Sequence, residues 1–433
     1  MSMPTSSKTL SAAQVAARLG VRVETVYAYV SREILSRSVA SDGRSSRFDS
    51  AEVEALARRG RPRKGMKRVG TVDVSLASSL TQVSPEGRLA YRGHEIASLA
   101  ASCQYEQVAE LLWTGEIPPR RRWSGGPDAA GLRASKSLPK KSPPVERLAV
   151  VAAAMACAQE DRGELREADV IRQARRMIQT FVAALPLCGR PGPGGRSGVG
   201  RDAGVPARGK EGDASGGRLA ARLWPRLSPR PANRSRLRAL DTALIVLADH
   251  ELATSTLAAR VAASTRADAF LAVVAGLAAV SGALHGRAAA GAYDLLAAAE
   301  AESSGAAAVA AVLSGGGARS GGAGAASLPG FGHPVYEESD PRTEILLARV
   351  LETATPAAAA TILEVREAAD AETDAAANID FALGALAYAE GMAPAATEAV
   401  FAIARTAGWI AHVLEEYGEA PLRFRARAIY DGS

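Results

Sequence analysis

Aromatic side chains are scarce in this sequence, at 5% of its 433 residues, whereas alanine dominates the 47% that is hydrophobic. Strands favour aromatic and β-branched residues, and alanine has the highest intrinsic helix propensity. The composition therefore excludes a protein built mainly from strands, and we expect an all-α fold. The length is enough for two or three domains.

Cysteine is rarer still: Cys103, Cys157 and Cys188 match no metal-binding or redox spacing, which indicates a reduced, cytoplasmic protein. The first ten residues lack the apolar core of a signal peptide. The longest weakly polar run, residues 269–284, is too short to span a bilayer. We expect no membrane partner.

Signatures of bound cofactors are also missing. No phosphate-binding glycine motif follows a strand and opens a helix. The five histidines are too far apart to form a metal-binding helix face, and they lack cysteine or carboxylate companions at ligand spacing. We expect neither a metal site nor a cofactor.

Positive charge is concentrated at one end of the chain. Residues 1–68 hold 14 Lys or Arg against six Asp or Glu, a net charge of +8, although the whole chain carries +6. A local basic excess of this kind favours a polyanionic partner. Residues 61–68 form a basic linker broken by glycine and proline.

Residues 1–60 have the pattern of a small separate domain. Two short helices are expected around Gly20, the first with a capping box of Ser11 and Gln14. An Asp-Gly pair at 42–43 predicts a hairpin, and a third helix is expected after Asp49.

This pattern resembles the winged helix-turn-helix of excisionases and MerR-type regulators, in which the second helix enters the major groove of DNA and arginines bind phosphates. The resemblance implies that duplex DNA is a partner. The alternative is a solvated helical appendage that contacts a protein. The implied DNA-binding residues are Arg22, Thr25, Tyr29 and Arg32 on an exposed helix face, and Arg44 and Arg47 in the wing.

The pattern changes at residue 69. Short alternating strands around a turn precede a helix, and further helical segments follow. Residues 189–217 are rich in Gly, Pro and Arg without periodicity, and we predict a disordered loop there.

Polar side chains interrupt the apolar helices that follow this loop. They are His250, His285, His333, Arg342, Asp380 and Arg405. A single histidine on an apolar face is usually a core residue, but so many polar groups within 160 residues point to acid–base chemistry. Histidine exchanges protons near neutral pH, a carboxylate among apolar groups is a stronger base, and arginine binds carboxylates.

These stretches, in this order, resemble the citrate synthase family over residues 69–433. The motifs are "LAYRGHEI" (89–96), "ADHELATSTLAARV" (248–261), "SGALHG" (281–286), "GFGHPVYEESDPR" (330–342), "NIDF" (378–381) and "FAIARTAGWIAHVLEE" (401–416). The resemblance implies a large helical domain over 69–286 and 392–433 and a small one over 287–391. It also implies a homodimer with shared active sites.

The resemblance implies a role for each polar group. Asp380 would remove the methyl proton of acetyl-CoA, His285 would stabilise the enol, and His333 would polarise and protonate the ketone of oxaloacetate. The oxaloacetate carboxylates would be held by His250, Arg342, Arg405 and, from the partner subunit, Arg425. CoA would be bound by the loop that contains Gly330, Gly332 and Tyr336.

Three functions remain open from the sequence. The first is a citrate synthase with a DNA-binding-type domain, and the second is a 2-methylcitrate synthase that uses propionyl-CoA. No residue decides between them, since one methylene changes binding by only about 1–3 kcal/mol. The third is a DNA-binding regulator that uses a citrate synthase-like body as a metabolite sensor.

Overall fold

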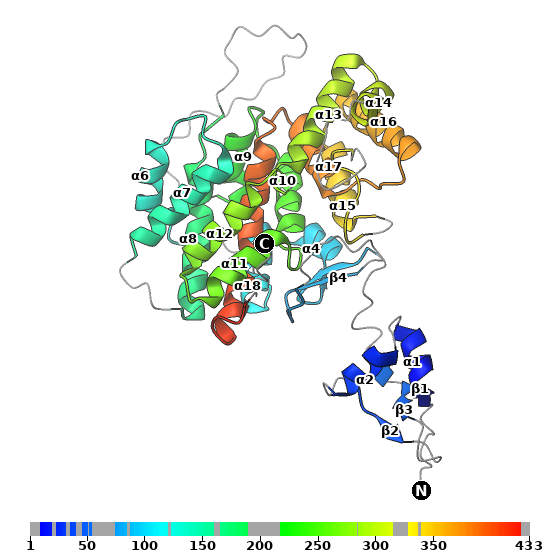
Figure 1. Cartoon of the computed structure of the whole chain (residues 1–433). Coiled ribbons are helices and arrows are strands. Elements are labelled where there is room, and N and C mark those ends of the chain that lie inside the picture. Colours follow the sequence, from blue (N-terminus) through cyan, green and yellow to red (C-terminus); the bar gives the residue numbers. More distant parts are fainter. Residues whose placement is uncertain are drawn as a thin grey trace, which may run out of the picture. The chain divides into compact units, whose positions relative to one another are not determined.

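The computed structural model describes residues 9–19, 23–31, 35–39, 46–50, 52–53, 74–84, 87–119, 123–159, 165–188, 217–283, 285–314, 328–336 and 339–425. The chain divides into two units, Met1–Leu76 and Ala77–Ser433 (Figure 1). The predicted linker at 61–68 and nearly all of the predicted loop at 189–217 lie outside the described residues.

The first unit combines two helices with a small antiparallel sheet. Its elements are β1 (Thr9–Ser11), α1 (Ala12–Leu19), α2 (Val23–Ser31), β2 (Ser38–Val39) and β3 (Ser46–Asp49), with strand order β1-β3-β2. The capping box is confirmed, because Ser11 N donates to Gln14 Oε1 and Gln14 N donates to Ser11 Oγ. Val15, Val26 and Phe48 form its core.

Assignment of this unit to a winged helix-turn-helix stays a prediction. Arg22, Arg32, Arg44 and the hairpin tip lie outside the described residues. Thr25 lies in α2 and Arg47 lies in β3. Tyr29 differs from expectation, since it is half-buried against the core, whereas Tyr27 is 41% exposed.

The second unit opens with a second three-stranded sheet, which confirms the strands expected before the first helix. Its strands are β4 (Thr81–Val83), β5 (Leu89–Tyr91) and β6 (His94–Glu95), and β5 lies between the other two. Backbone register pairs Thr81 with Tyr91. Helices dominate the second unit, as expected, and the strands of the chain form only two small sheets.

Helices before residue 287 and the last helix pack together. They are α4 (Ile96–Ser102), α5 (Tyr105–Thr114), α6 (Ala129–Ser137), α7 (Pro144–Cys157), α8 (Glu167–Ala184), α9 (Leu219–Leu227), α10 (Arg234–Leu247), α11 (Thr254–Ser264), α12 (Ala269–Val280) and α18 (Ala396–Gly418). The helix α18 contacts α5, α7, α8, α10, α11 and α12. Residues 396–413 are all buried, as expected for a helix surrounded by others.

A second group of helices follows α12 and precedes α18 along the chain. It contains α13 (Ala288–Glu302), α14 (Gly305–Ser314), α15 (Pro341–Leu351), α16 (Pro356–Glu372) and α17 (Ile379–Ala389). These helices contact one another, and they occupy one end of the second unit in Figure 1. They fall within the predicted small domain, whose limits stay a prediction. Within the described residues, no helix is long and apolar enough to cross a membrane.

Candidate active site

The loop around His333 is joined to the start of α17. Gly332 N donates to Ala376 O over 2.8 Å, and Asn378 N donates to Gly330 O over 2.8 Å. The side chain of Asn378 donates to Gly332 O over 2.7 Å and accepts from Asp380 N over 2.9 Å. Gly330 and Gly332 have φ of 85° and 79°, which glycine adopts without strain. The loop and the helix that carries Asp380 therefore form one hydrogen-bonded piece.

Both ring nitrogens of His333 face donors. Its Nδ1 faces the backbone N–H groups of Val335 and Tyr336 at 3.0 and 3.3 Å, and its Nε2 lies 3.2 Å from Nη2 of Arg342. A neutral ring accepts at one nitrogen only, and arginine only donates. When Nδ1 accepts, the ring carries its proton on Nε2, and Nε2 and Nη2 can both donate to a ligand placed between them.

Arg342 is buried and held by a neighbouring carboxylate. Its Nε donates to Asp340 Oδ1 and its Nη2 to Oδ2, each over 2.8 Å. Asp340 Oδ2 also accepts from Ile379 N over 3.0 Å, so the same carboxylate fixes the start of α17. Among the described residues Nη1 of Arg342 makes no hydrogen bond, and the Nη1 edge remains for a ligand.

His250 lies against the same loop. Its Nε2 is 3.0 Å from the hydroxyl of Tyr336, and its ring centroid is 5.3 Å from that of His333. Burial, together with the nearby charges of Arg342 and Arg405, holds the pKa of His250 well below its usual value. His250 is therefore neutral at pH 7.

Arg405 comes from the central helix α18 and is 2% exposed. Its Nε donates to Leu247 O over 2.8 Å, and its guanidinium lies 4.7 Å from the ring centroid of Phe401. The same ring makes an edge-to-face contact with His285, with centroids 5.5 Å apart. Phe401 thus lies between the predicted carboxylate-binding arginine and the predicted enol-stabilising histidine.

Asp380 occupies the first turn of α17. Burial raises the pKa of its carboxyl to about 6, although the charge of Arg342 acts in the opposite direction. Among the described residues its carboxylate makes no side-chain hydrogen bond. A carboxylate of this kind is a stronger base than an exposed aspartate and still ionises at neutral pH.

His285 is oriented by a hydroxyl from α11. Ser255 Oγ accepts from Trp409 Nε1 over 3.3 Å and lies 2.9 Å from Nε2 of His285. When the Ser255 hydroxyl donates its proton to Nε2, the neutral ring carries its own proton on Nδ1. Burial and the charge of Arg405 lower the pKa of His285 to about 4, so the ring is neutral at pH 7, and in this arrangement its Nδ1–H can donate.

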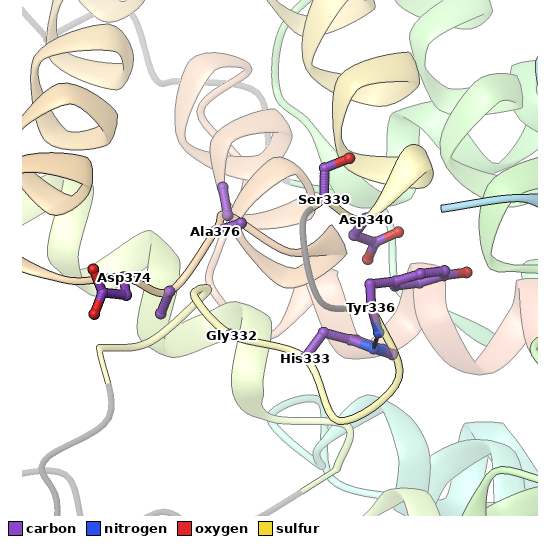
Figure 2. Close-up of a pocket in the computed structure, with 9 residues that line it drawn as sticks. Gly332, His333, Tyr336, Ser339, Asp340, Asp374 and Ala376 are labelled. Carbon is purple, nitrogen blue, oxygen red and sulfur yellow. Dashed lines mark hydrogen bonds between the residues drawn. The ribbon is translucent and has the colours of Figure 1, made fainter. Parts of the chain in front are cut away.

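A cavity of about 320 Å³ opens beside this cluster. It is lined by Gly332, His333, Tyr336, Ser339, Asp340, Asp374 and residues 375–377. Figure 2 shows the rings of His333 and Tyr336 close together, with Asp374 across the loop from them. The cavity therefore lies between the loop of His333 and the segment that precedes α17.

The contacts divide the predicted residues into two groups. Direct contacts connect His250, His333 and Arg342, and Phe401 connects His285 with Arg405. Gly332 and Tyr336 line the cavity, whereas Gly330 does not. Arg425 is exposed near the end of the described chain.

Several residues of the site were not recognised from sequence. They are Asp340, Ser255, Trp409 and Phe401, and the hydroxyl of Tyr336 was assigned no role. Only Asp340 had a usable signal, because an aspartate before proline is a common helix N-cap, and its side chain caps α15.

Residues 69–427 match the family model described as "Citrate synthase, C-terminal domain". The chain belongs to the citrate synthase family. The matched segment contains every predicted catalytic and substrate-binding residue. It begins after the basic end of the chain, which the family model does not include.

Similar proteins divide between two activities. A citrate synthase of Haloferax volcanii is 29% identical over 363 residues, which cover 80% of this chain and 90% of the relative. A 2-methylcitrate synthase of Corynebacterium glutamicum is 27% identical and covers 82% of this chain and 92% of the relative.

Solved structures share the fold. A citrate synthase of Thermoplasma acidophilum, in ternary complex with carboxymethyl coenzyme A and oxaloacetate, aligns with a TM-score of 0.63 at 24% identity. It covers 84% of this chain and 94% of its own. That of Pyrobaculum aerophilum gives 0.64 at 24% identity, covering 83% of this chain and 91% of its own.

Proposed function

We propose that this protein condenses an acyl-CoA with oxaloacetate and hydrolyses the thioester product, which releases a tricarboxylic acid and CoA. The observation that carries the proposal is one cluster that combines a base, two imidazole donors and two buried arginines. Asp380 is the base, His285 and His333 are the donors, and Arg342 and Arg405 supply positive charge.

Asp380 and His285 would act on the acyl-CoA. The α-carbon of a thioester is a very weak acid, so a carboxylate can deprotonate it only if the enolate oxygen receives a hydrogen bond in the same step. The Nδ1–H of His285 is the donor for that oxygen. The pKa of Asp380, raised to about 6 by burial, suits a base that works near neutral pH.

His333 and the arginines would act on oxaloacetate. The Nε2–H of His333 donates to the ketone oxygen and transfers its proton as the carbon–carbon bond forms. Arg342 offers its Nη1 edge to a carboxylate, while Asp340 holds its other edge. Arg405 and His250 complete the pocket for the dicarboxylate.

The cavity beside Tyr336 supports a place for CoA along the loop of Gly330 and Gly332. Exposure of Arg425 supports its predicted reach into the site of a partner subunit in a homodimer. The reaction needs no metal or cofactor, because the enolate is stabilised by a hydrogen bond and the electrophile is a bound ketone.

A thiol-release assay tests the proposal and decides between the two acyl groups. Purified protein is mixed with oxaloacetate and either acetyl-CoA or propionyl-CoA, and free CoA is measured with a thiol reagent. We expect release with at least one of them that depends on oxaloacetate. Thiol release without oxaloacetate would indicate a hydrolase, and no release with either would contradict the proposal.

We further propose that residues 1–60 bind duplex DNA. The net charge of +8 in residues 1–68 and the two helices beside a three-stranded sheet support this partner. The affinity should fall steeply with salt, because each neutralised phosphate releases counterions. Retention of duplex DNA by the full chain, measured at two salt concentrations, tests it. No retention at low salt would favour a protein partner.

A further inference from the structure

The three residues before His250 each accept a hydrogen bond from the same face of α18, two through their backbone carbonyls and one through its side chain. Arg405 Nε donates to Leu247 O over 2.8 Å, and Gly408 N donates to Ala248 O over 3.0 Å. One turn further on, His412 Nε2 lies 3.3 Å from Oδ2 of Asp249. Positions 405, 408 and 412 share a helix face, so α18 fixes residues 247 to 249 in order.

Asp249 depends on two side chains to satisfy its carboxylate. It is fully buried, and its Oδ2 accepts from Thr81 Oγ1 over 2.5 Å as well as from His412. Its Oδ1 is buried and has no hydrogen-bond partner in the described part of the chain. Burial opposes ionisation, yet His412 and Arg405 hold the pKa of Asp249 below its usual value.

The proton on His412 is placed by an arginine. Nη1 of Arg260 lies 3.1 Å from Nδ1 of His412, and because arginine only donates, Nδ1 accepts and Nε2 carries the proton. Arg260 is itself fully buried and paired with Glu415 and Glu416 over 2.9 and 3.0 Å. His412 therefore presents a fixed N–H to Asp249.

The consequence for His250 follows from the backbone. Asp249 O accepts from the hydroxyl of Tyr91 over 2.9 Å, and Glu251 has a φ of 50°, so the chain is confined on both sides of His250. The imidazole of His250 then reaches Tyr336 Oη. A shift of Asp249 moves His250 directly, since one peptide bond separates them.

We propose that His412 is a positioning residue, which donates to Asp249 and so sets where the imidazole of His250 lies in the oxaloacetate pocket. This inference rests on the proposed function, in which His250 contacts oxaloacetate. His412 itself touches no substrate. Its loss should therefore weaken oxaloacetate binding more than acyl-CoA binding.

The test compares His412→Leu with His412→Gln, whose amide Nε2 can stand in for Nε2 of His412 as the donor to Asp249. Oxaloacetate binding is measured by calorimetry, and KM for both substrates is measured by thiol release. We expect His412→Leu to weaken oxaloacetate binding about 10- to 100-fold, as displaced positioning groups do, and to leave KM for the acyl-CoA within about twofold. His412→Gln should recover most of the loss.

Two further variants control for folding. Val413→Ala truncates a buried side chain one residue along α18 without touching Asp249, and it should lower Tm while leaving oxaloacetate binding unchanged. Thr81→Val removes the other donor to Asp249 and should also weaken oxaloacetate binding. It replaces His412→Leu in the test if that variant does not fold.

The outcomes separate the two proposals. If the wild type binds oxaloacetate but releases no thiol, the proposed function fails, and the effect of His412 on binding is still measured. If His412→Leu or, failing that, Thr81→Val binds oxaloacetate as tightly as the wild type, the positioning role is wrong. Equal weakening for both substrates would also overturn it.

Discussion

Asp380 and His285 are two titratable groups whose surroundings move their pKa values in opposite directions. Burial raises the pKa of the carboxyl to about 6 and lowers that of the imidazole to about 4. At pH 7 the carboxylate is ionised and the imidazole is neutral. These are the protonation states that a base and a hydrogen-bond donor require.

Replacing Asp380 with Asn should lower the rate of thiol release at least about 100-fold, because removal of a general base has effects of this size. Oxaloacetate binding should stay within about threefold, since the base acts on the other substrate. The measurements are steady-state rates and calorimetric titration. A variant that keeps more than a tenth of the rate would show that another group is the base.

The pH profile should report the same carboxyl. Below pH 6 Asp380 is protonated before substrate binds, so kcat/KM for the acyl-CoA should fall by about tenfold per pH unit. His285 should add no limb above pH 5, because its pKa is about 4. A profile that is flat from pH 5 to 8 would contradict the assignment.

The stability of the protein should depend on this group with a definite sign. The raised pKa means that the folded protein disfavours ionised Asp380, so stability is lost as pH rises from 3.8 through 6. Asp380→Asn should therefore raise Tm at pH 8 and have a smaller effect at pH 5. Thermal unfolding at the two pH values measures the difference.

Arg342→Leu should weaken oxaloacetate binding much more than acyl-CoA binding, because it removes a charge-assisted contact to a carboxylate. The loss in the free energy of oxaloacetate binding should be about 2–3 kcal/mol. Asp340 would also lose its partner, so Asp340→Asn is the matched control: it keeps the charge of Arg342 while loosening its position. If both substrates weaken equally in Arg342→Leu, a folding defect is the cause.

Helix α18 acts at the scale of a whole element. It carries Arg405, Gly408, Trp409 and His412, which together hold the end of α10 and, through Ser255, orient His285. A change of the helix position would therefore reach both halves of the site.

Gly408→Ala tests how closely α18 approaches its neighbour. A Cβ at this position would clash with Asp249 Oδ1 and would lie 2.5 Å from Ala248 O. The Ala248 carbonyl belongs to the backbone, so it can move aside only if the chain before His250 shifts. We expect a loss of about 1–3 kcal/mol or more, as for overpacked cores, measured by urea unfolding.

Gly418→Ala is the control for Gly408→Ala, because it ends the same helix and nothing lies within 4 Å of its added Cβ. We expect a change between zero and a gain of about 1 kcal/mol, from reduced freedom of the unfolded chain. A similar loss in Gly418→Ala would show that the close approach of Gly408 to Asp249 and Ala248 is not the cause of the effect.

The sequence predicted the helices and strands better than it predicted the contacts between residues that are distant in the chain. Helical periodicity and the Ser11 capping box were local patterns and are confirmed by the structure. The hydroxyl of Tyr336 meets His250 across 86 residues, and Trp409 meets Ser255 across 154. No spacing encodes such pairs, because the first depends on where the loop of Tyr336 lies against His250, and the second on how α18 packs against α11. Tyr29 was misplaced on an exposed face because a short helix of mixed residues does not define its buried side.

At the scale of the molecule, the two units divide the proposed work. Every predicted catalytic residue lies in Ala77–Ser433, and the basic excess lies in the first 68 residues. Hydrogen bonds also mark where the second unit begins, because Ser78 and Ser79 bond Glu415, and Thr81 bonds Asp249.

A pair of truncations tests this division. Removal of residues 1–76 should leave thiol release within about twofold, since it cuts at the boundary between the units. Removal of residues 1–84 also deletes β4 and the donors to Glu415 and Asp249, and it should abolish turnover or folding. Loss of activity in the shorter truncation, with a folded protein, would show that the first unit is part of the enzyme.

Three hydrogen bonds join the loop of His333 to the segment before Asp380, two of them made by Asn378 and one by Ala376. The side chain of Asn378 also accepts from Asp380 N. The two segments are 45 residues apart in the gene but cannot diverge independently. A bulkier residue at Gly330 would meet Phe381 at 2.9 Å, so an evolutionary change in one segment requires a compensating change in the other. Across related sequences, substitutions in residues 330–333 should therefore be accompanied by substitutions in residues 376–381, whatever acyl group each enzyme uses.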